Sequence, residues 1–240
     1  ITLHPEVAIH TGGEIAWAVR KNSPALREEL NAFITEHNQG TEFGNIMFTR
    51  YLQDTQWVTN AAATEEREKF DQMVALFKKY AEMYGFDYLM VGAQAYQESK
   101  LDHSVVSPSG AVGVMQILPA TAADPAVGIP DIHDLENNIH AGIKYLHHIY
   151  ENTFKEAEMD IINKGLFAFA AYNAGPKKIQ DLRQTAVERG LDPNIWFQNV
   201  ERVAAEVIGR ETVQYVQNIY KYYIAYTLIV RQAELRQTEE

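Results

Sequence analysis

One carboxylate stands out because of the residues that surround it. Glu98 lies near the end of the segment Asp87–Ser99, in which apolar residues would occupy nearly every side of a helix. Such a helix is expected to be buried, and burial disfavours the charged form of a carboxyl group and raises its pKa. A carboxylic acid with a raised pKa can donate a proton near neutral pH, as the cleavage of a glycosidic bond requires. For an isolated glutamate, pairing with a buried arginine or lysine is the commoner arrangement.

A segment rich in Gly, Pro and Ser begins nine residues after Glu98. Residues 107–116 read Ser-Pro-Ser-Gly-Ala-Val-Gly-Val-Met-Gln and are expected to begin as a loop. Glycines in this segment would let the backbone pass close to a ligand. Ser107 and Gln116 offer hydrogen bonds to hydroxyl and acetamido groups, although the segment by itself could be any loop between two helices.

Two polar side chains end another apolar helix much later in the chain. Tyr172 and Asn173 follow an apolar segment and come just before Gly175. The plain interpretation of this ending is a helix C-cap made by Asn173 and Gly175. A capping role is compatible with contact to a sugar.

In this order, these pieces resemble the motifs of soluble-type lytic transglycosylases of glycoside hydrolase family 23. Each motif is weak alone, but their order and spacing make the set specific, and the resemblance covers about residues 65–235. Val114 stands where that family more often has Leu, a similar apolar residue. The residues that carry the resemblance are Glu98-Ser99, Ser107, Gly113-Val114-Met115-Gln116, Ala171-Tyr172-Asn173 and, for the final motif, Glu211-Thr212-Val213-Gln214-Tyr215-Val216.

The resemblance implies a lysozyme-like α-helical fold and a non-hydrolytic reaction on peptidoglycan. Glu98 would protonate the glycosidic oxygen between N-acetylmuramic acid and N-acetylglucosamine. The same group would then take the proton of the muramic 6-hydroxyl, which attacks the anomeric carbon and leaves a 1,6-anhydromuramyl end. The muramic 2-acetamido group would stabilise the cationic centre, a substrate-assisted exception to the use of two carboxylates.

The same resemblance assigns the partners and the remaining site residues. The partners would be glycan strands and muropeptides, and no cofactor is implied. Glu211, in the first turn of its helix, would either contact the peptide stem or only favour the helix dipole. Residues that would line the sugar sites or hold Glu98 are Ser107, Met115, Gln116, Tyr172, Asn173, Glu211 and Tyr215.

Helix signals predict the elements that would position these residues, from Thr64 onward. Thr64 is a plausible N-cap, Gly85 ends the first apolar stripe, and Asp87 caps the buried helix that carries Glu98. Asp134 begins an amphipathic helix, and residues 165–171 are again apolar on all sides. Pro176 opens a short polar helix, and residues 211–231 form the last long one. The main domain is therefore predicted to be all-α.

The first part of the chain has a different character. Residues 14–20 alternate and predict a strand, and a helix over residues 25–36 follows Pro24. This pair resembles the last strand and helix of a type 2 periplasmic solute-binding module, which precedes the catalytic domain in one subgroup of the family. We therefore expect residues 1–40 to be the remnant of such a module, 41–63 a connector and 64–240 the catalytic domain. A piece processed or excised from a longer protein would fit this organisation.

Composition excludes several other classes of function. The net charge of −11 argues against nucleic acid as a partner, and the absence of cysteine excludes disulfides and thiolate sites. No apolar run approaches the length of a membrane span. The resemblance implies the periplasm, with attachment to the outer membrane through parts outside this chain.

Four histidines lie close together in the sequence but do not form a metal-binding pattern. His133, His140, His147 and His148 show no zinc-type spacing, so no metal site is predicted.

Two other functions remain possible from the sequence. A goose-type lysozyme-like hydrolase, which would use water in place of the 6-hydroxyl, remains an alternative function. A non-catalytic glycan-binding or cell-wall scaffold module is the alternative from another class.

Overall fold

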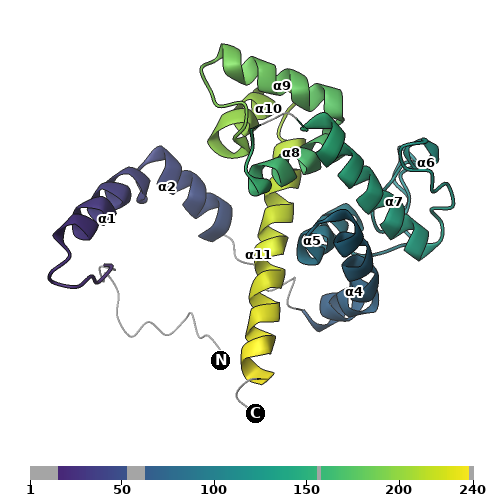
Figure 1. Ribbon diagram of the computed structural model, residues 1–240, viewed down its shortest axis with the longest axis horizontal. Coiled ribbons are helices and arrows are strands. Elements are labelled where there is room, and N and C mark those ends of the chain that lie inside the picture. The colour runs from purple at the N-terminus through teal and green to yellow at the C-terminus, as the bar shows by residue number, and fades with distance from the viewer. Residues whose placement is uncertain (1–15, 53–62, 156–157, 238–240) are drawn as a thin grey trace. The chain divides into compact units, whose positions relative to one another are not determined.

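The computed structural model describes residues 16–52, 63–155 and 158–237. The chain divides into two compact units, residues 1–54 and residues 55–240. The expected boundaries at residues 40 and 63 lie on either side of this division. The described residues of each unit are mainly helical (Figure 1).

Among its described residues, the first unit contains two helices and a π-helical turn, namely α1 (Pro24–His37), α2 (Glu42–Met47) and η1 (Phe48–Leu52). Pro24 stands at the first position of α1, where a missing N–H costs nothing. The side chain of Thr41 caps α2 by accepting from the backbone N–H of Gly44 at 3.0 Å. The helix expected after Pro24 is confirmed, whereas the helical residues 42–52 were expected to be connector.

The strand expected at residues 14–20 is not found in its described part. Residues 16–20 carry no strand, and residues 14 and 15 lie outside the described residues. The alternating pattern favours extended backbone, but a strand forms only where a neighbour pairs with its N–H and C=O groups. The main-chain contact of this stretch is a turn, in which Ser23 N donates to Arg20 O at 3.1 Å.

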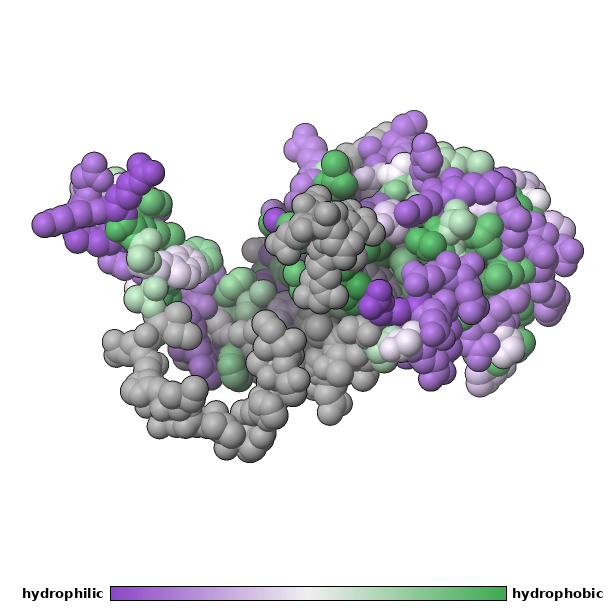
Figure 2. All heavy atoms as spheres, turned by 90° about the horizontal axis from the view of Figure 1, so that it is seen from below, coloured by the Kyte–Doolittle hydropathy of each residue, from purple (hydrophilic) through white to green (hydrophobic). Residues whose placement is uncertain are grey.

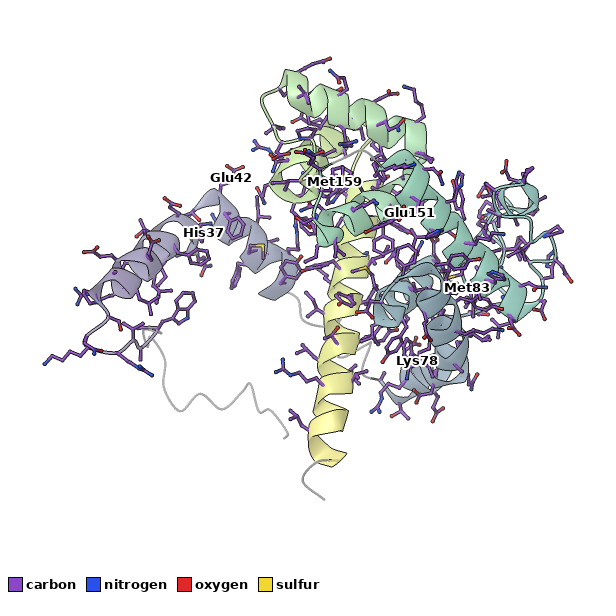
Figure 3. All side chains as sticks on the ribbon, in the orientation of Figure 1. His37, Glu42, Lys78, Met83, Glu151 and Met159 are labelled. Carbon is purple, nitrogen blue, oxygen red and sulfur yellow. The ribbon has the colours of Figure 1, made fainter. Side chains whose placement is uncertain are left out.

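Apolar side chains of the first unit are exposed. Helix α1 buries none of its residues, and Trp17 and Phe33 are 58% and 49% exposed. Figure 2 shows apolar side chains lying at the surface of this unit among hydrophilic ones. The rings of Trp17, Phe33, His37 and Phe43 stand in a row, with centroids 6.1, 4.2 and 4.7 Å apart (His37 is labelled in Figure 3). Trp17 and Phe33 therefore keep much of their ring surface accessible.

The second unit is a bundle of helices, and its described residues contain isolated bridges but no strand. The all-α class predicted from the sequence is confirmed. No helix of the described residues is long and apolar enough to cross a membrane. The elements are α4 (Thr64–Tyr84), α5 (Tyr88–Ser99), α6 (Pro119–Ala123), α7 (Leu135–His148), η2 (Ile149–Thr153), α8 (Ile161–Ala174), α9 (Pro176–Glu188), η3 (Trp196–Val200), α10 (Glu201–Val207) and α11 (Glu211–Gln237).

The helix boundaries follow from local signals in the sequence. Gly85 ends α4 with φ +74°, a conformation that glycine adopts without strain. Asp87 caps α5 by accepting from Leu89 N at 2.8 Å, and Asp134 caps α7 by accepting from Asn137 N at 2.9 Å. Asp160 caps α8 in the same way. The caps expected at Gly85, Asp87 and Asp134 are thus confirmed. The N-cap expected at Thr64 is wrong, because Thr64 is the first residue of α4 and Ala63 stands at the cap position.

Helices α5 and α8 lie at the centre of the bundle. Helix α11 packs along both of them, and α4 covers another side of α5 (Figure 1). Both central helices are therefore surrounded, which explains why their apolar residues occupy nearly every side. Completely buried side chains on these and neighbouring elements include Phe77, Val91, Ile143, Phe167, Trp196 and Ile219.

Candidate active site

Glu98 lies one residue before the end of α5, and its side chain is mostly buried. The end of this helix is fixed by Ser99, whose hydroxyl donates to Ala95 O at 3.3 Å and to Val114 O at 3.0 Å. The second bond joins α5 to the loop between α5 and α6. Glu98 is therefore held at the point where the helix meets that loop.

The surroundings of Glu98 change its proton affinity. Burial raises the pKa of its carboxyl group from 4.5 to about 7. A hydrogen bond from the Tyr215 hydroxyl to Glu98 Oε1 acts in the opposite direction, because it stabilises the carboxylate. Burial is the larger effect. The group thus exchanges a proton near neutral pH, as a single acid and base needs.

Tyr215 lies on α11 and remains protonated. Burial, the nearby Glu98 carboxyl and the hydrogen bond between them hold the pKa of the phenol well above its ordinary value. Its oxygen also accepts from Nε2 of Gln94 at 3.3 Å. Gln94 lies one helical turn before Glu98, and sequence reasoning did not single it out.

The loop after α5 is folded back on itself by two isolated bridges, Val106 with Val112 and Val112 with Ile117. Gly113 has a φ of +74°, and an added Cβ would lie 2.6 Å both from Asn138 Nδ2 and from His103 Nδ1. Only glycine fits this position, because both the conformation and the space exclude a side chain. The close approach expected of the glycines is here an approach to protein atoms.

Asn138 on α7 holds this loop and was missed by the sequence analysis. Its side chain is completely buried and makes three hydrogen bonds to backbone groups. The amide oxygen accepts from Met115 N at 2.9 Å, and the nitrogen donates to Val112 O at 2.9 Å and Ile132 O at 3.0 Å. A polar residue within the inward face of a predicted amphipathic helix was the available signal.

Two of the predicted site residues, Ser107 and Gln116, shape the loop. The hydroxyl of Ser107 accepts from Ala111 N at 3.0 Å and shares a hydrogen bond of 2.8 Å with Ser109. Nε2 of Gln116 donates to Val105 O at 3.0 Å and Gly113 O at 2.8 Å. Gln116 also has a φ of +44°, which is unusual for a residue with a side chain. A role for either residue in sugar binding stays a prediction.

Met115 and Tyr172 connect the loop to α8. The side chain of Met115 is completely buried against Gly142, so its side chain is not positioned to touch a glycan. Its carbonyl accepts from the Tyr172 hydroxyl at 2.8 Å. Burial and, to a smaller extent, Glu98 hold the pKa of Tyr172 well above its ordinary value. Tyr172 therefore contributes a neutral ring beside the site.

Asn173 and Glu211 are exposed, unlike Tyr215. The side-chain oxygen of Asn173 accepts from the buried hydroxyl of Thr212 at 2.8 Å, which joins α8 to the start of α11. Glu211 is the first residue of α11. The structure thus places Tyr215 on Glu98, and it gives Asn173 and Glu211 accessible positions at neighbouring helix ends.

A known family matches the part of the chain that contains Glu98. The model of the transglycosylase SLT domain matches residues 75–194, which is half of the chain. The chain belongs to this family. The matched residues include Glu98, Ser107, Gln116 and Tyr172, whereas Tyr215 lies beyond them.

Several curated proteins that are similar to this chain carry the name Membrane-bound lytic murein transglycosylase F. The protein of that name from Desulfosudis oleivorans is 34% identical over 226 residues, which are 87% of this chain and 49% of the relative. The one from Photobacterium profundum is 30% identical over 247 residues, with 92% and 46% covered. The chain spans about half the length of the curated relatives it matches. These names agree with the family resemblance found in the sequence.

Among solved structures, an inactive mutant of the lytic transglycosylase Slt from Pseudomonas aeruginosa matches with a TM-score of 0.49. It is 25% identical, and the match covers 65% of this chain and 24% of that one.

A cavity of about 400 Å³ in the second unit is not lined by Glu98. It is formed by α4, α5 and the second half of α11, with Lys78 on its wall (Figure 3). Phe70, Leu89 and Ile229 give it an apolar lining. Neither Glu98 nor any other predicted site residue contributes to it, so size alone does not locate the chemistry.

Two of the four histidines considered as metal ligands, His140 and His147, lie at the contact between α4 and α7. His140 Nε2 shares a hydrogen bond of 2.8 Å with the Tyr84 hydroxyl, and the His140 ring stacks on Tyr80 at 4.2 Å. The ring of His147 lies 5.1 Å from that of Tyr84. Burial lowers the pKa of His140, so the ring is neutral at neutral pH.

Proposed function

We propose that this chain is the catalytic part of a peptidoglycan lytic transglycosylase. The observation that carries the proposal is a buried carboxyl group, Glu98, whose pKa of about 7 suits both proton donation and proton acceptance. The family and the names of the relatives support the same activity. Glycan strands and muropeptides are the proposed substrates.

In the first step, the protonated Glu98 donates its proton to the glycosidic oxygen that links N-acetylmuramic acid to N-acetylglucosamine. The bond between this oxygen and the anomeric carbon breaks, and the leaving sugar departs with a new hydroxyl group. Glu98 is now a carboxylate, and it accepts the hydrogen bond of Tyr215. This donor stabilises the charge without giving up its own proton, because the pKa of Tyr215 lies well above neutral pH.

In the second step, the Glu98 carboxylate takes the proton of the muramic 6-hydroxyl. The 6-oxygen attacks the anomeric carbon and closes the 1,6-anhydro ring, and Glu98 returns to its protonated form. The attacking group belongs to the substrate, so it has a large effective concentration over water. One carboxyl group is therefore sufficient for both proton transfers.

Two other carboxylates, Asp102 and Glu201, are held by hydrogen bonds of their own. Asp102 is exposed, and hydrogen bonds from Ser104 lower its pKa. Glu201 is buried, but its oxygen accepts from Gln198 N at 2.8 Å. The family and the names of the relatives support the transglycosylase over the goose-type hydrolase, and the buried acid supports an enzyme over a glycan-binding module.

The location and the organisation of the whole protein belong to the same proposal. The relatives are named as membrane-bound murein enzymes, and we propose a periplasmic protein attached to the outer membrane. Attachment would reside outside this chain. Residues 1–40 would be the remnant of a solute-binding module, 41–63 the connector and 64–240 the catalytic domain.

Mass spectrometry of the products from purified peptidoglycan tests the proposed function. Muropeptides with 1,6-anhydromuramyl ends are expected, each lighter by one water molecule than the hydrolysed counterpart. Products with reducing muramic ends would establish the hydrolase instead. Binding without any cleavage would establish the glycan-binding module.

A further inference from the structure

Gln94 occupies a buried position where an apolar side chain would destabilise the folded protein less. Gln94 lies on α5 and is completely buried, and its Oε1 has no hydrogen-bond partner among the described residues. A buried polar atom without a partner costs about 1–3 kcal/mol. The remaining described contact of the amide is the bond from Nε2 to the Tyr215 hydroxyl, at 3.3 Å. Gln94 is thus poorly suited to stabilising the core, and its polar contact is with the group that holds Glu98.

The chemistry of the phenol decides which end of the Gln94 amide faces it. A phenol has one proton to donate, and Tyr215 donates it to Glu98 Oε1. A second partner of the phenol oxygen must then be a donor, which the amide nitrogen is and the amide oxygen is not. With the nitrogen in place, Gln94, Tyr215 and Glu98 form a chain of hydrogen bonds in one direction.

We propose that Gln94 is a positioning residue, whose amide keeps the Tyr215 hydroxyl directed at Glu98 during proton transfer. The amide donates to the phenol oxygen, so the phenol proton has Glu98 as its acceptor. Hydrogen bonds in a chain polarise and strengthen one another. The contact therefore favours the carboxylate form of Glu98, which exists between the two proton transfers. Its effect on turnover, though not the contact itself, rests on the proposed function.

Few groups compete with this effect on Glu98. Tyr215 on α11 and Tyr172 on α8 are titratable groups that interact with the carboxyl group. The Tyr172 hydroxyl is engaged with Met115 O at 2.8 Å. Both phenols stay protonated because burial raises their pKa. The hydrogen bond from Tyr215 is then the contact through which Gln94 acts.

The test measures the pKa of Glu98 directly, by a carbon-13 NMR titration of glutamate carboxyl groups in the full chain, with Glu98→Gln used for assignment. Gln94→Met removes the amide at nearly equal volume, and Tyr215→Phe removes the hydroxyl. We expect the pKa of Glu98 to rise by roughly half a pH unit in Gln94→Met and by more in Tyr215→Phe. Gln94→Met added to Tyr215→Phe should cause no further rise.

Two comparisons separate this proposal from a general packing effect. Gln97→Met is the matched control, since Gln97 lies on α5 and also has a buried Oε1 that no described residue contacts by a hydrogen bond. Any change in the Glu98 pKa that Gln97→Met causes should be the same in the wild-type and in the Tyr215→Phe background. Gln94→Leu repeats the measurement with a second apolar side chain, in case Gln94→Met does not fold. An unchanged Glu98 pKa in the folded Gln94 variant, or an equal rise in the Tyr215→Phe background, would overturn the proposal.

The titration and the product analysis can fail independently. The titration needs no substrate, so it tests the contact whatever the chain cleaves. If 1,6-anhydro products form, the pH profile of kcat/KM should move upward with the Glu98 pKa in Gln94→Met. Reducing-end products, together with the expected titration, would overturn the proposed function and leave the role of Gln94 intact.

Discussion

Replacing Glu98 by Gln should make the protein more stable and inactive. In the folded protein, burial raises the pKa of Glu98 from 4.5 to about 7. Between these values the folded state binds a proton that the unfolded state has released, so the wild type loses stability as the pH rises through this range. At about 1.4 kcal/mol per pH unit, the full loss is about 3 kcal/mol above pH 7. Gln is nearly isosteric and carries no charge, so the variant escapes this loss.

The effect has a defined dependence on pH. The stability advantage of Glu98→Gln should grow by about 2 kcal/mol between about pH 5.5 and about pH 8.5. Urea unfolding of both proteins across this range measures the difference. Glu68→Gln is the matched control, because Glu68 is exposed on α4 and the same substitution there should leave the pH dependence unchanged.

Activity and stability should therefore change in opposite directions. Gln cannot donate or recover a proton, and the loss of general acid–base catalysis typically costs about 10²- to 10⁴-fold in rate. Cleavage is followed through the release of muropeptides. Parallel stability curves for wild type and variant would refute the burial of Glu98, and near wild-type cleavage by the variant would refute its role.

Three other perturbations test features of the structure. Gly113→Ala should destabilise the protein by at least about 2 kcal/mol in urea unfolding, and Gly110→Ala by about 1 kcal/mol. Both glycines have a positive φ, but only Gly113 lacks space for a Cβ. Equal losses of stability in the two variants would contradict this. Asn138→Ala should cost about 2–4 kcal/mol and reduce cleavage, since it removes three buried hydrogen bonds, and full activity would show that the loop does not depend on it. Substituting Ser for both Trp17 and Phe33 should reduce self-association in sedimentation velocity, because these exposed rings offer an apolar contact; a wild type that stays monomeric at every concentration would exclude this.

The helices of the second unit were predictable because their signals are local. Asp87 and Asp134 cap α5 and α7 through side chains that bond to the next turn, and Gly85 ends α4. Short elements such as α6 and α10 lack a full apolar stripe and were not predicted. The strand in residues 14–20 was predicted from alternation, which reports an exposed and a buried face but not a pairing partner.

The site was predictable in part, for a related reason. Glu98 could be found from its apolar surroundings, and Tyr215 from the family motif. The contacts of Gln94 and Asn138 depend on residues far away in the chain, and no local pattern encodes them. Both are polar residues within apolar helix faces, and the sequence alone does not say what such residues bind.

The hydrogen bond between Glu98 and Tyr215 joins residues that are 117 positions apart. During synthesis, α5 therefore leaves the ribosome long before the helix that covers it. A nascent chain that stops short of α11 would hold Glu98 in water, where a carboxyl group is ionised at neutral pH and has no proton to give. The proposed acid would form only when the last helix is in place, so a copy that ends before α11 should leave peptidoglycan uncut.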